Sequence, residues 1–256
     1  MSNTEKFFNL IKIKDCGLTK IRVGNEGDGG YVAYKELCEQ SKVVYSFGVG
    51  NDVGFELAWV QMFPNSEIKL FDPIITALPK EHQRFTFQRY GIGLQFQPLD
   101  LVENNSTLKM DVEYDEWGAL QIFKKDVLNS FSQILVEFHI IHVAPQGDLS
   151  PYFSQLYRKV TKGINQDLFA YYYDALMFLT NNFHIFHIHA NNSLPVVHCD
   201  GFTFPPLLEM SLVRKDLVRG QVTDGRVGFP VTGLDVANKA DRPDIVGYYP
   251  FKRISV

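Results

Sequence analysis

The chain of 256 residues has few cysteines, no excess of charge of one sign and no long apolar run. Its cysteines, Cys16, Cys38 and Cys199, lie far apart and form no Cys-x-x-Cys pair, which argues against a disulfide framework and against a zinc site. The 25 basic and 29 acidic residues give a net charge of −4, so we expect neither a nucleic-acid-binding module nor a polybasic membrane surface. No run approaches the ~18 apolar residues of a membrane span, and the amino-terminal residues lack the apolar core of a signal peptide. We therefore expect a cytoplasmic protein.

Short apolar runs alternate with longer helical patterns, and no repeat or Gly/Pro/Ser-rich linker interrupts them. The predicted strands are 43–48, 68–72, 85–93, 107–111, 133–139, 184–189 and 207–214, and the predicted helices are 52–63, 117–131 and 167–182. This alternation predicts an α/β fold, with a Rossmann-like, doubly wound and mostly parallel sheet that has helices on both faces. We expect a single domain with an amino-terminal lid or cap segment at 1–42, a core at 43–215 and a carboxyl-terminal surface segment at 216–256.

A candidate nucleoside site lies where the first two predicted strands end. Gly48 and Gly50 follow the first strand directly, and glycines at this point let the backbone approach a ligand closely. Asp72 ends the second strand about twenty residues later, the spacing of an acid that binds ribose hydroxyls. Val53 stands where a dinucleotide fingerprint has its third glycine, so the pattern favours an adenosine-type ligand over a dinucleotide.

The runs 44–52 (VYSFGVGND), 70–73 (LFDP) and 108–113 (LKMDVE) resemble motifs of class I S-adenosylmethionine-dependent methyltransferases, most closely the FkbM-like and methyltransferase-like 24 group. The glycine-rich run 22–31 and the late run 234–245 also match. The resemblance implies S-adenosylmethionine as cofactor, with the following contacts: Gly48, Val49, Gly50 and Asn51 around the methionine part, Asp72 and Pro73 at the ribose, Gly91, Ile92 and Gly93 beside the adenine, and a loop over the cofactor that brings Asp28 or Tyr31 to the methionine end. The common Asp-Val-Glu-Gly of the family is Asp-Val-Glu-Tyr here, so Tyr114 predicts a differently shaped turn.

Acidic and histidine side chains gather where three later strands are predicted to end. Asp111 and Glu113 follow the fourth strand, Glu137 and His139 end the fifth, and His189 ends the sixth. Because neighbouring parallel strands lie ~4.8 Å apart, we expect these groups to meet in one crevice. Asp111, Glu137 and His189 are the predicted ligands of a divalent cation, Mg²⁺ or Mn²⁺. Without a metal, His139 is the predicted general base, with Asp111 and Glu113 as further catalytic candidates. A histidine in an apolar run is also often a packed residue without a catalytic role.

The sequence therefore predicts an O-methyltransferase that acts on a hydroxyl of a sugar or nucleotide-activated sugar, for example in surface polysaccharide synthesis. The sugar follows from the resemblance and from a polar pocket edge expected at Asn191, Asn192 and Asp200. One alternative is an NAD(P)-dependent oxidoreductase, disfavoured by the missing third glycine and the lack of a Tyr-x-x-x-Lys pair. Another is a cofactor-binding partner subunit without catalysis. We expect a small-molecule substrate and no nucleic-acid partner, and a homo-oligomer is left open.

Overall fold

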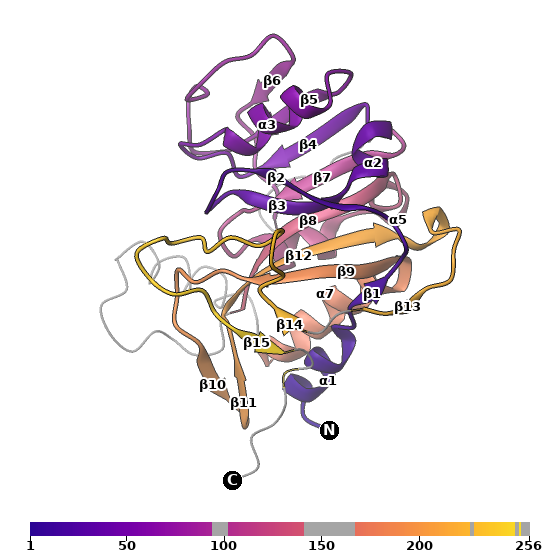
Figure 1. Cartoon of the computed structure of the whole chain (residues 1–256), viewed down its shortest axis with the longest axis vertical. Helices are drawn as coiled ribbons and strands as arrows, with labels where there is room; N and C mark the ends of the chain where they lie inside the picture. Colours follow the sequence, from indigo (N-terminus) through magenta and orange to yellow (C-terminus); the bar gives the residue numbers. More distant parts are fainter. Residues whose placement is uncertain (94–101, 141–166, 226–227, 249–250, 252–256) are drawn as a thin grey trace.

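The computed structural model describes residues 1–93, 102–140, 167–225, 228–248 and 251. At its centre is a seven-stranded sheet of order β6-β5-β4-β7-β8-β12-β9 (Figure 1). Its strands are β4 (Val43–Phe47), β5 (Glu67–Phe71), β6 (Phe85–Gln88), β7 (Ser106–Met110), β8 (Phe131–His139), β9 (Phe183–Ala190) and β12 (Leu207–Arg214). The five strands β4 to β8 are parallel to one another, whereas β12 is antiparallel to both of its neighbours, β8 and β9. The predicted Rossmann-like, mostly parallel sheet is confirmed.

Every residue of β4, β7 and β8 is buried, as the continuous apolar character of these runs predicted. A sheet that is buried on both faces must be covered by other elements on each side. The helices are α1 (Asn3–Leu10), α2 (Lys35–Gln40), α3 (Gly54–Met62), α4 (Glu116–Ile122), α5 (Lys125–Leu128), α7 (Leu168–Asn182) and the 3₁₀ turn η1 (Lys215–Leu217).

Helices α1, α4 and α7 pack together and bury an aromatic cluster against one face of the sheet. The ring of Phe7 in α1 lies 5.7 Å from that of Trp117 in α4 and 5.6 Å from that of Phe169 in α7. The single helix predicted over 117–131 is wrong: it is divided at Phe123, whose backbone is extended, and Phe131 already belongs to β8. Helical spacing of apolar residues does not separate one helix from two consecutive helices that bury the same side.

A β-hairpin in the amino-terminal segment covers part of the other face. It consists of β2 (Lys20–Gly24) and β3 (Gly30–Tyr34), so the glycine-rich stretch predicted as a loop is the turn between two strands. Its contacts with the sheet include a hydrogen bond from Ser211 Oγ in β12 to the carbonyl of Val32 (2.6 Å). Helix α3 packs against β2, which places the hairpin beside the glycine loop after β4.

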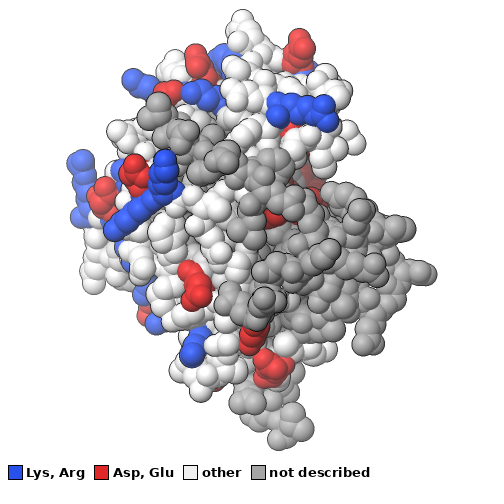
Figure 2. All heavy atoms as spheres, turned by 180° about the vertical axis from the view of Figure 1, so that it is seen from behind, with Lys and Arg blue, Asp and Glu red and all other residues white. Residues whose placement is uncertain are grey.

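Four short strand pairings complete the fold outside the central sheet. They are β1 (Lys14–Asp15) with β13 (Thr223–Asp224), β10 (Val197–Cys199) with β11 (Phe202–Phe204), β14 (Gly228–Phe229) with β15 (Gly247–Tyr248), and the β2–β3 hairpin. Within the described ranges, no helix has the length and apolar character needed to cross a membrane. On the face shown in Figure 2, basic and acidic side chains of the described residues are interspersed.

Candidate functional site

A cavity of about 690 Å³ opens at the carboxyl ends of β4, β5 and β7. This is the edge at which open α/β sheets bind their ligands. The cavity is lined by Asp28, Phe47, Gly48, Val49, Gly50, Asn51, Asp52, Phe71, Asp72, Pro73, Ile74, Tyr90, Gly91, Ile92, Asp111, Val112, Glu113 and Asp115. The structure thus brings together most of the residues predicted to bind the cofactor. Of that set, Tyr31 and Gly93 lie outside the lining.

The glycine loop after β4 is held against the start of the segment that follows β7. Gly48 has a φ of +79°, and a Cβ on it would lie 1.6 Å from the carbonyl oxygen of Asp111. Lys109 Nζ donates a hydrogen bond to the carbonyl of Gly48 (2.9 Å) from the neighbouring strand. Only glycine combines this backbone conformation with so close an approach. The loop therefore has one defined position at the wall of the cavity.

Asp72 fixes the same loop from the other side. Its Oδ2 accepts hydrogen bonds from the backbone N–H groups of Val49 (3.1 Å) and Gly50 (2.9 Å), and its Oδ1 accepts from those of Ile74 (2.7 Å) and Ile75 (3.1 Å). Burial alone raises the pKa of Asp72, but these four donors outweigh it and hold the pKa below its usual value. A carboxylate offers about four lone-pair positions, so the main chain engages all of them. Asp72 thus has a structural role that its spacing did not reveal, and the ribose contact stays a prediction.

The hairpin contributes one residue to the wall of the cavity and places another behind it, beside Asp111. Asp28 lies at the wall, and the turn is held to the start of α3 by Asn25, whose amide donates to Asp52 and to the carbonyl of Asp28. Tyr31 is buried below the turn, and its hydroxyl lies 3.4 Å from Asp111 Oδ2. The hairpin therefore reaches the acidic end of the cavity.

At that end, His139 lies between two carboxylates. Its Nδ1 is 3.0 Å from Glu116 Oε1, and its Nε2 is 3.4 Å from Glu113 Oε2. Burial lowers the pKa of His139, but Glu116 and Glu113 outweigh it and raise the pKa well above its usual value. In this arrangement the two carboxylates favour the protonated form of the ring. The hypothesis that His139 is a free general base therefore needs a state in which one carboxylate is neutralised by another group.

The two acids that follow β7, Asp111 and Glu113, have pKa values shifted in opposite directions. Burial raises the pKa of Asp111 to about 6, against the opposing effects of Lys109 and His139. The hydrogen bond to His139 lowers the pKa of Glu113. The pKa of Asp111 is thus raised toward neutrality, the range in which a group can both take up and release a proton.

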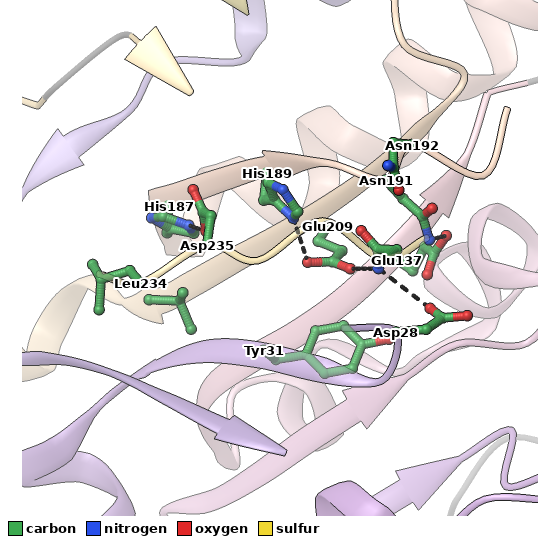
Figure 3. Close-up of polar contacts among 12 residues, drawn as sticks. Asp28, Tyr31, Glu137, His187, His189, Asn191, Asn192, Glu209, Leu234 and Asp235 are labelled. Carbon is green, nitrogen blue, oxygen red and sulfur yellow. Dashed lines mark hydrogen bonds and ion pairs between the residues drawn. The ribbon is translucent and has the colours of Figure 1, made fainter. Parts of the chain in front are cut away.

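The predicted metal ligands Asp111, Glu137 and His189 are not brought together. Strand β12 lies between β8 and β9, so Glu209 faces Glu137 on one side and His189 on the other. Figure 3 shows this row, with His189 Nδ1 at 3.1 Å from Glu209 Oε2. Glu209 therefore lies between Glu137 and His189, and no group of three ligand atoms within 4.8 Å of one another includes either of these two residues in the described part of the chain. Among the described residues, the set with ligand atoms within 4.8 Å of one another is Asp111, Glu113 and His139.

Glu137 is instead held in a buried hydrogen-bond network. Asn191 Nδ2 donates to Glu137 Oε1 (2.9 Å; Figure 3). Burial, reinforced by Asp111, raises the pKa of Glu137 well above its usual value. Asn192 is also buried and binds backbone groups of residues 239–243, while Asp200 accepts from Thr4 Oγ1 (2.5 Å). Internal contacts thus engage all three side chains, and the polar pocket edge expected at Asn191, Asn192 and Asp200 stays a prediction.

Residues 231–245 form a segment that crosses the end of β9 and β12, where the sequence predicted only a surface loop. Its anchoring contacts are His187 Nε2 to Asp235 Oδ1 (2.7 Å), His189 Nε2 to Asp244 (3.3 Å), and Asn238 Nδ2 to Glu209 Oε1 (2.6 Å) and Asp28 Oδ1 (3.2 Å). Burial lowers the pKa of His189, but Glu209, Asp235 and Asp244 outweigh it and raise the pKa to about 9.

Sequence reasoning missed Glu116, Glu209, Asn238 and Lys109 as members of this region. A signal existed for some of them. Glu209 interrupts an apolar strand, and Asn238 belongs to the late run that matched the family motifs. Glu116 begins a helix and reads as an ordinary first-turn acid, so its contact with His139 follows only from the fold.

No protein-family model matches the chain, and no curated protein matches its sequence. Three methyltransferases are among the solved structures that resemble it. Human N-acetylserotonin methyltransferase in complex with SAM has 12% identity and a TM-score of 0.34, over 83% of this chain and 51% of that one. Precorrin-6y C5,15-methyltransferase from Geobacter metallireducens has 8% identity and a TM-score of 0.38, over 75% and 98%. N,N-8-amino-8-demethyl-D-riboflavin dimethyltransferase from Streptomyces davawensis has 12% identity and a TM-score of 0.33, over 70% and 51%.

The chain spans about half the length of the first and third of these proteins. At these identities and TM-scores the similarities carry no functional conclusion. The class of the protein therefore follows from its own strand order and cavity: it is a Rossmann-like α/β protein with a candidate nucleoside site at the carboxyl edge of its sheet.

Proposed function

We propose that the protein is a methyltransferase that uses S-adenosylmethionine and methylates a hydroxyl group. The observation that carries this proposal is the cavity at the carboxyl ends of β4, β5 and β7, bounded by the glycine loop and Asp72. The sheet supports it as well. A dinucleotide-binding sheet of order 3-2-1-4-5-6 has no antiparallel strand between its last two members, whereas here β12 occupies that place, which disfavours the nicotinamide alternative.

The lining fits this cofactor from end to end. Tyr90 and Ile92 provide apolar walls for an adenine ring, and Asp72 and Pro73 lie where the ribose is expected. Asp28 and Asp111 place carboxylates at the opposite end, where the positive charges of the methionine part suit them. When bound there, the cofactor would supply a methyl group on a cationic sulfur.

For the chain's own residues, the task is to orient the acceptor and to handle its proton. Correct orientation of two reactants accounts for a large part of the acceleration of such a displacement. Asp111 lines the cavity, and its pKa of about 6 suits a proton acceptor. We propose Asp111 as that acceptor, while His139 and Glu116 position the turn that carries Glu113. Assistance by a divalent cation is the alternative route for the same proton.

The acceptor is proposed to be a sugar or a nucleotide-activated sugar, with surface polysaccharide synthesis as its setting. Support comes from the motif resemblance and from the carboxylates at the acidic end of the cavity, because ionised carboxylates are strong acceptors of hydroxyl hydrogen bonds. The predicted Asn191 and Asn192 edge does not support it, since both amides are engaged internally.

Calorimetric titration of the full chain with S-adenosylmethionine, its demethylated product and NADPH tests the cofactor. We expect binding of the first two and none of NADPH; the reverse result would establish the oxidoreductase alternative. Transfer of labelled methyl groups to a panel of nucleotide sugars, free sugars and phenols then tests the acceptor. Binding without transfer to any hydroxyl would favour a partner subunit without catalysis.

A further inference from the structure

The cluster at the acidic end of the cavity has the composition and geometry of a metal site. Asp111 follows β7 directly, Glu113 is two residues further on, and His139 ends the adjacent strand β8. One ligand atom from each lies within 4.8 Å of the other two. Atoms that bind one cation at 2.0–2.3 Å lie roughly 3–4.5 Å from one another, so only small side-chain shifts separate this arrangement from a coordination shell.

The orientation of the histidine ring is a second observation that points the same way. Glu116 is fully buried, and its Oε1 lies 3.0 Å from His139 Nδ1. The same oxygen accepts the backbone N–H groups of Val112 (3.1 Å) and Tyr114 (3.2 Å), which fixes the turn that carries Glu113. A carboxylate on one ring nitrogen, with the other nitrogen presented to a ligand, is the usual arrangement behind a metal-binding histidine.

The charges of the cluster favour a bound cation. Three carboxylates, those of Asp111, Glu113 and Glu116, surround one imidazole ring, and Glu116 Oε2 is buried without a hydrogen-bond partner among the described residues. Buried charge that lacks a partner is costly. A divalent ion between Asp111, Glu113 and His139 Nε2 would place two positive charges among these carboxylates.

We propose that Asp111, Glu113 and His139 bind a divalent cation of the Mg²⁺ and Mn²⁺ class. Carboxylate ligands and water suit these ions, and one imidazole favours Mn²⁺ over Ca²⁺. Glu116 is the positioning residue of the site. Because Asp111 and Glu113 also line the cavity, the ion lies at the edge of the proposed cofactor site.

The use of this ion in catalysis rests on the proposed function, whereas its binding does not. An acceptor hydroxyl on the ion would have a lower pKa and would release its proton to water. Its oxygen would then form the bond to the methyl carbon while the carbon–sulfur bond breaks, and the sulfonium would become a neutral thioether. The assignment replaces the predicted ligands Glu137 and His189 with Glu113 and His139.

Mn²⁺ binding to the full chain, followed by the loss of the free-ion electron paramagnetic resonance signal, tests the site without cofactor or substrate. The wild-type protein should bind one Mn²⁺, and Glu113→Gln should weaken binding by about tenfold or more, the lower end of the loss seen when a metal site is perturbed. Glu113 is exposed over half of its side chain, so this substitution leaves the core intact. Glu81→Gln, a change of another exposed carboxylate, is the matched control and should bind like wild type.

Asp111→Asn provides a second test at the wall of the cavity, with circular dichroism to verify folding. Absence of Mn²⁺ binding by the wild-type protein at millimolar ion, or equal affinity in wild type and Glu113→Gln, overturns the proposal. S-adenosylmethionine binding is measured separately in EDTA. Cofactor binding without Mn²⁺ binding refutes the metal site alone, and Mn²⁺ binding without cofactor binding refutes the proposed function alone.

Discussion

Replacement of Asp72 by Asn separates two roles for the acid at the end of β5. If Asp72 only binds the ribose, the substitution weakens cofactor binding and leaves the free energy of unfolding unchanged. The structure adds a second role, because four backbone N–H groups donate hydrogen bonds to the two carboxylate oxygens of Asp72. Asn has nearly the same shape, but its single oxygen can accept only about two of them, and its NH₂ group would face the other donors.

The expected loss follows from these contacts. A hydrogen bond to a charged group contributes about 1.5–3 kcal/mol when its donor is left unsatisfied, and less when water can replace the acceptor. The donors of Gly50, Ile74 and Ile75 are only partly buried, so the bond to Val49 dominates. We expect Asp72→Asn to lower the free energy of unfolding by about 2–4 kcal/mol and to weaken S-adenosylmethionine binding by at least about tenfold, which corresponds to ~1.4 kcal/mol.

The pH dependence of this difference has a defined sign. The fold lowers the pKa of Asp72 below its ordinary value. A carboxylate of this kind contributes stability above its unfolded-state pKa of about 3.9, and loses that contribution as the pH falls through the folded value. The stability gap between wild type and Asp72→Asn should therefore be constant near neutrality and shrink below about pH 4.

Urea denaturation between pH 3 and 7, roughly the range on either side of the unfolded-state pKa, measures this gap, and calorimetry with S-adenosylmethionine measures the affinity. Asp174→Asn, an exposed aspartate on α7, is the matched control. If Asp72→Asn unfolds within about 0.5 kcal/mol of wild type, the range of ordinary surface substitutions, then Asp72 does not organise the glycine loop.

Three further changes test other parts of the site. Gly48→Ala places a Cβ 1.6 Å from the carbonyl oxygen of Asp111 at a φ of +79°, and should destabilise the fold by about 2–5 kcal/mol in urea denaturation; a smaller loss would contradict the close approach. His189→Gln removes a group whose pKa is raised to about 9, so the stability that His189 contributes is complete below pH ~6.5 and is lost as the pH rises to about 9. The difference in unfolding free energy between wild type and variant should therefore narrow over this range, and a difference that widens contradicts the ion pairs with Glu209 and Asp244. Asn238→Asp sets a third carboxylate between two others and should cost about 1–3 kcal/mol; limited proteolysis should cleave residues 231–245 faster, and unchanged cleavage would refute this anchoring role.

The strand positions show how much of the fold the sequence could predict. The apolar runs that became β4, β5, β7, β8, β9 and β12 were located within a few residues, because most of their residues are buried and polar or glycine residues bound them. The hairpin β2–β3 was missed. Strand β2 mixes polar and apolar residues and β3 is only five residues long, so their pairing with each other and their contact with the sheet define them.

For the site, the sequence by itself predicts the residues that lie directly after a single strand. Gly48, Gly50 and Asp72 follow their strands directly, and parallel neighbours bring such ends together whatever the rest of the chain does. The cofactor-type cavity was therefore predictable from residue order and spacing alone.

Which acids meet which histidines was decided by the tertiary structure. The sequence placed the strand of His189 beside that of Glu137, but β12 returns from later in the chain and enters between them as the antiparallel member of the sheet. This insertion pairs His189 with Glu209 and leaves His139 to Glu113 and Glu116. Period-two alternation states which face of a strand a side chain occupies, but not which strand lies next to it. Strand order depends on long-range packing, and here it moved the candidate metal site from one set of ligands to another.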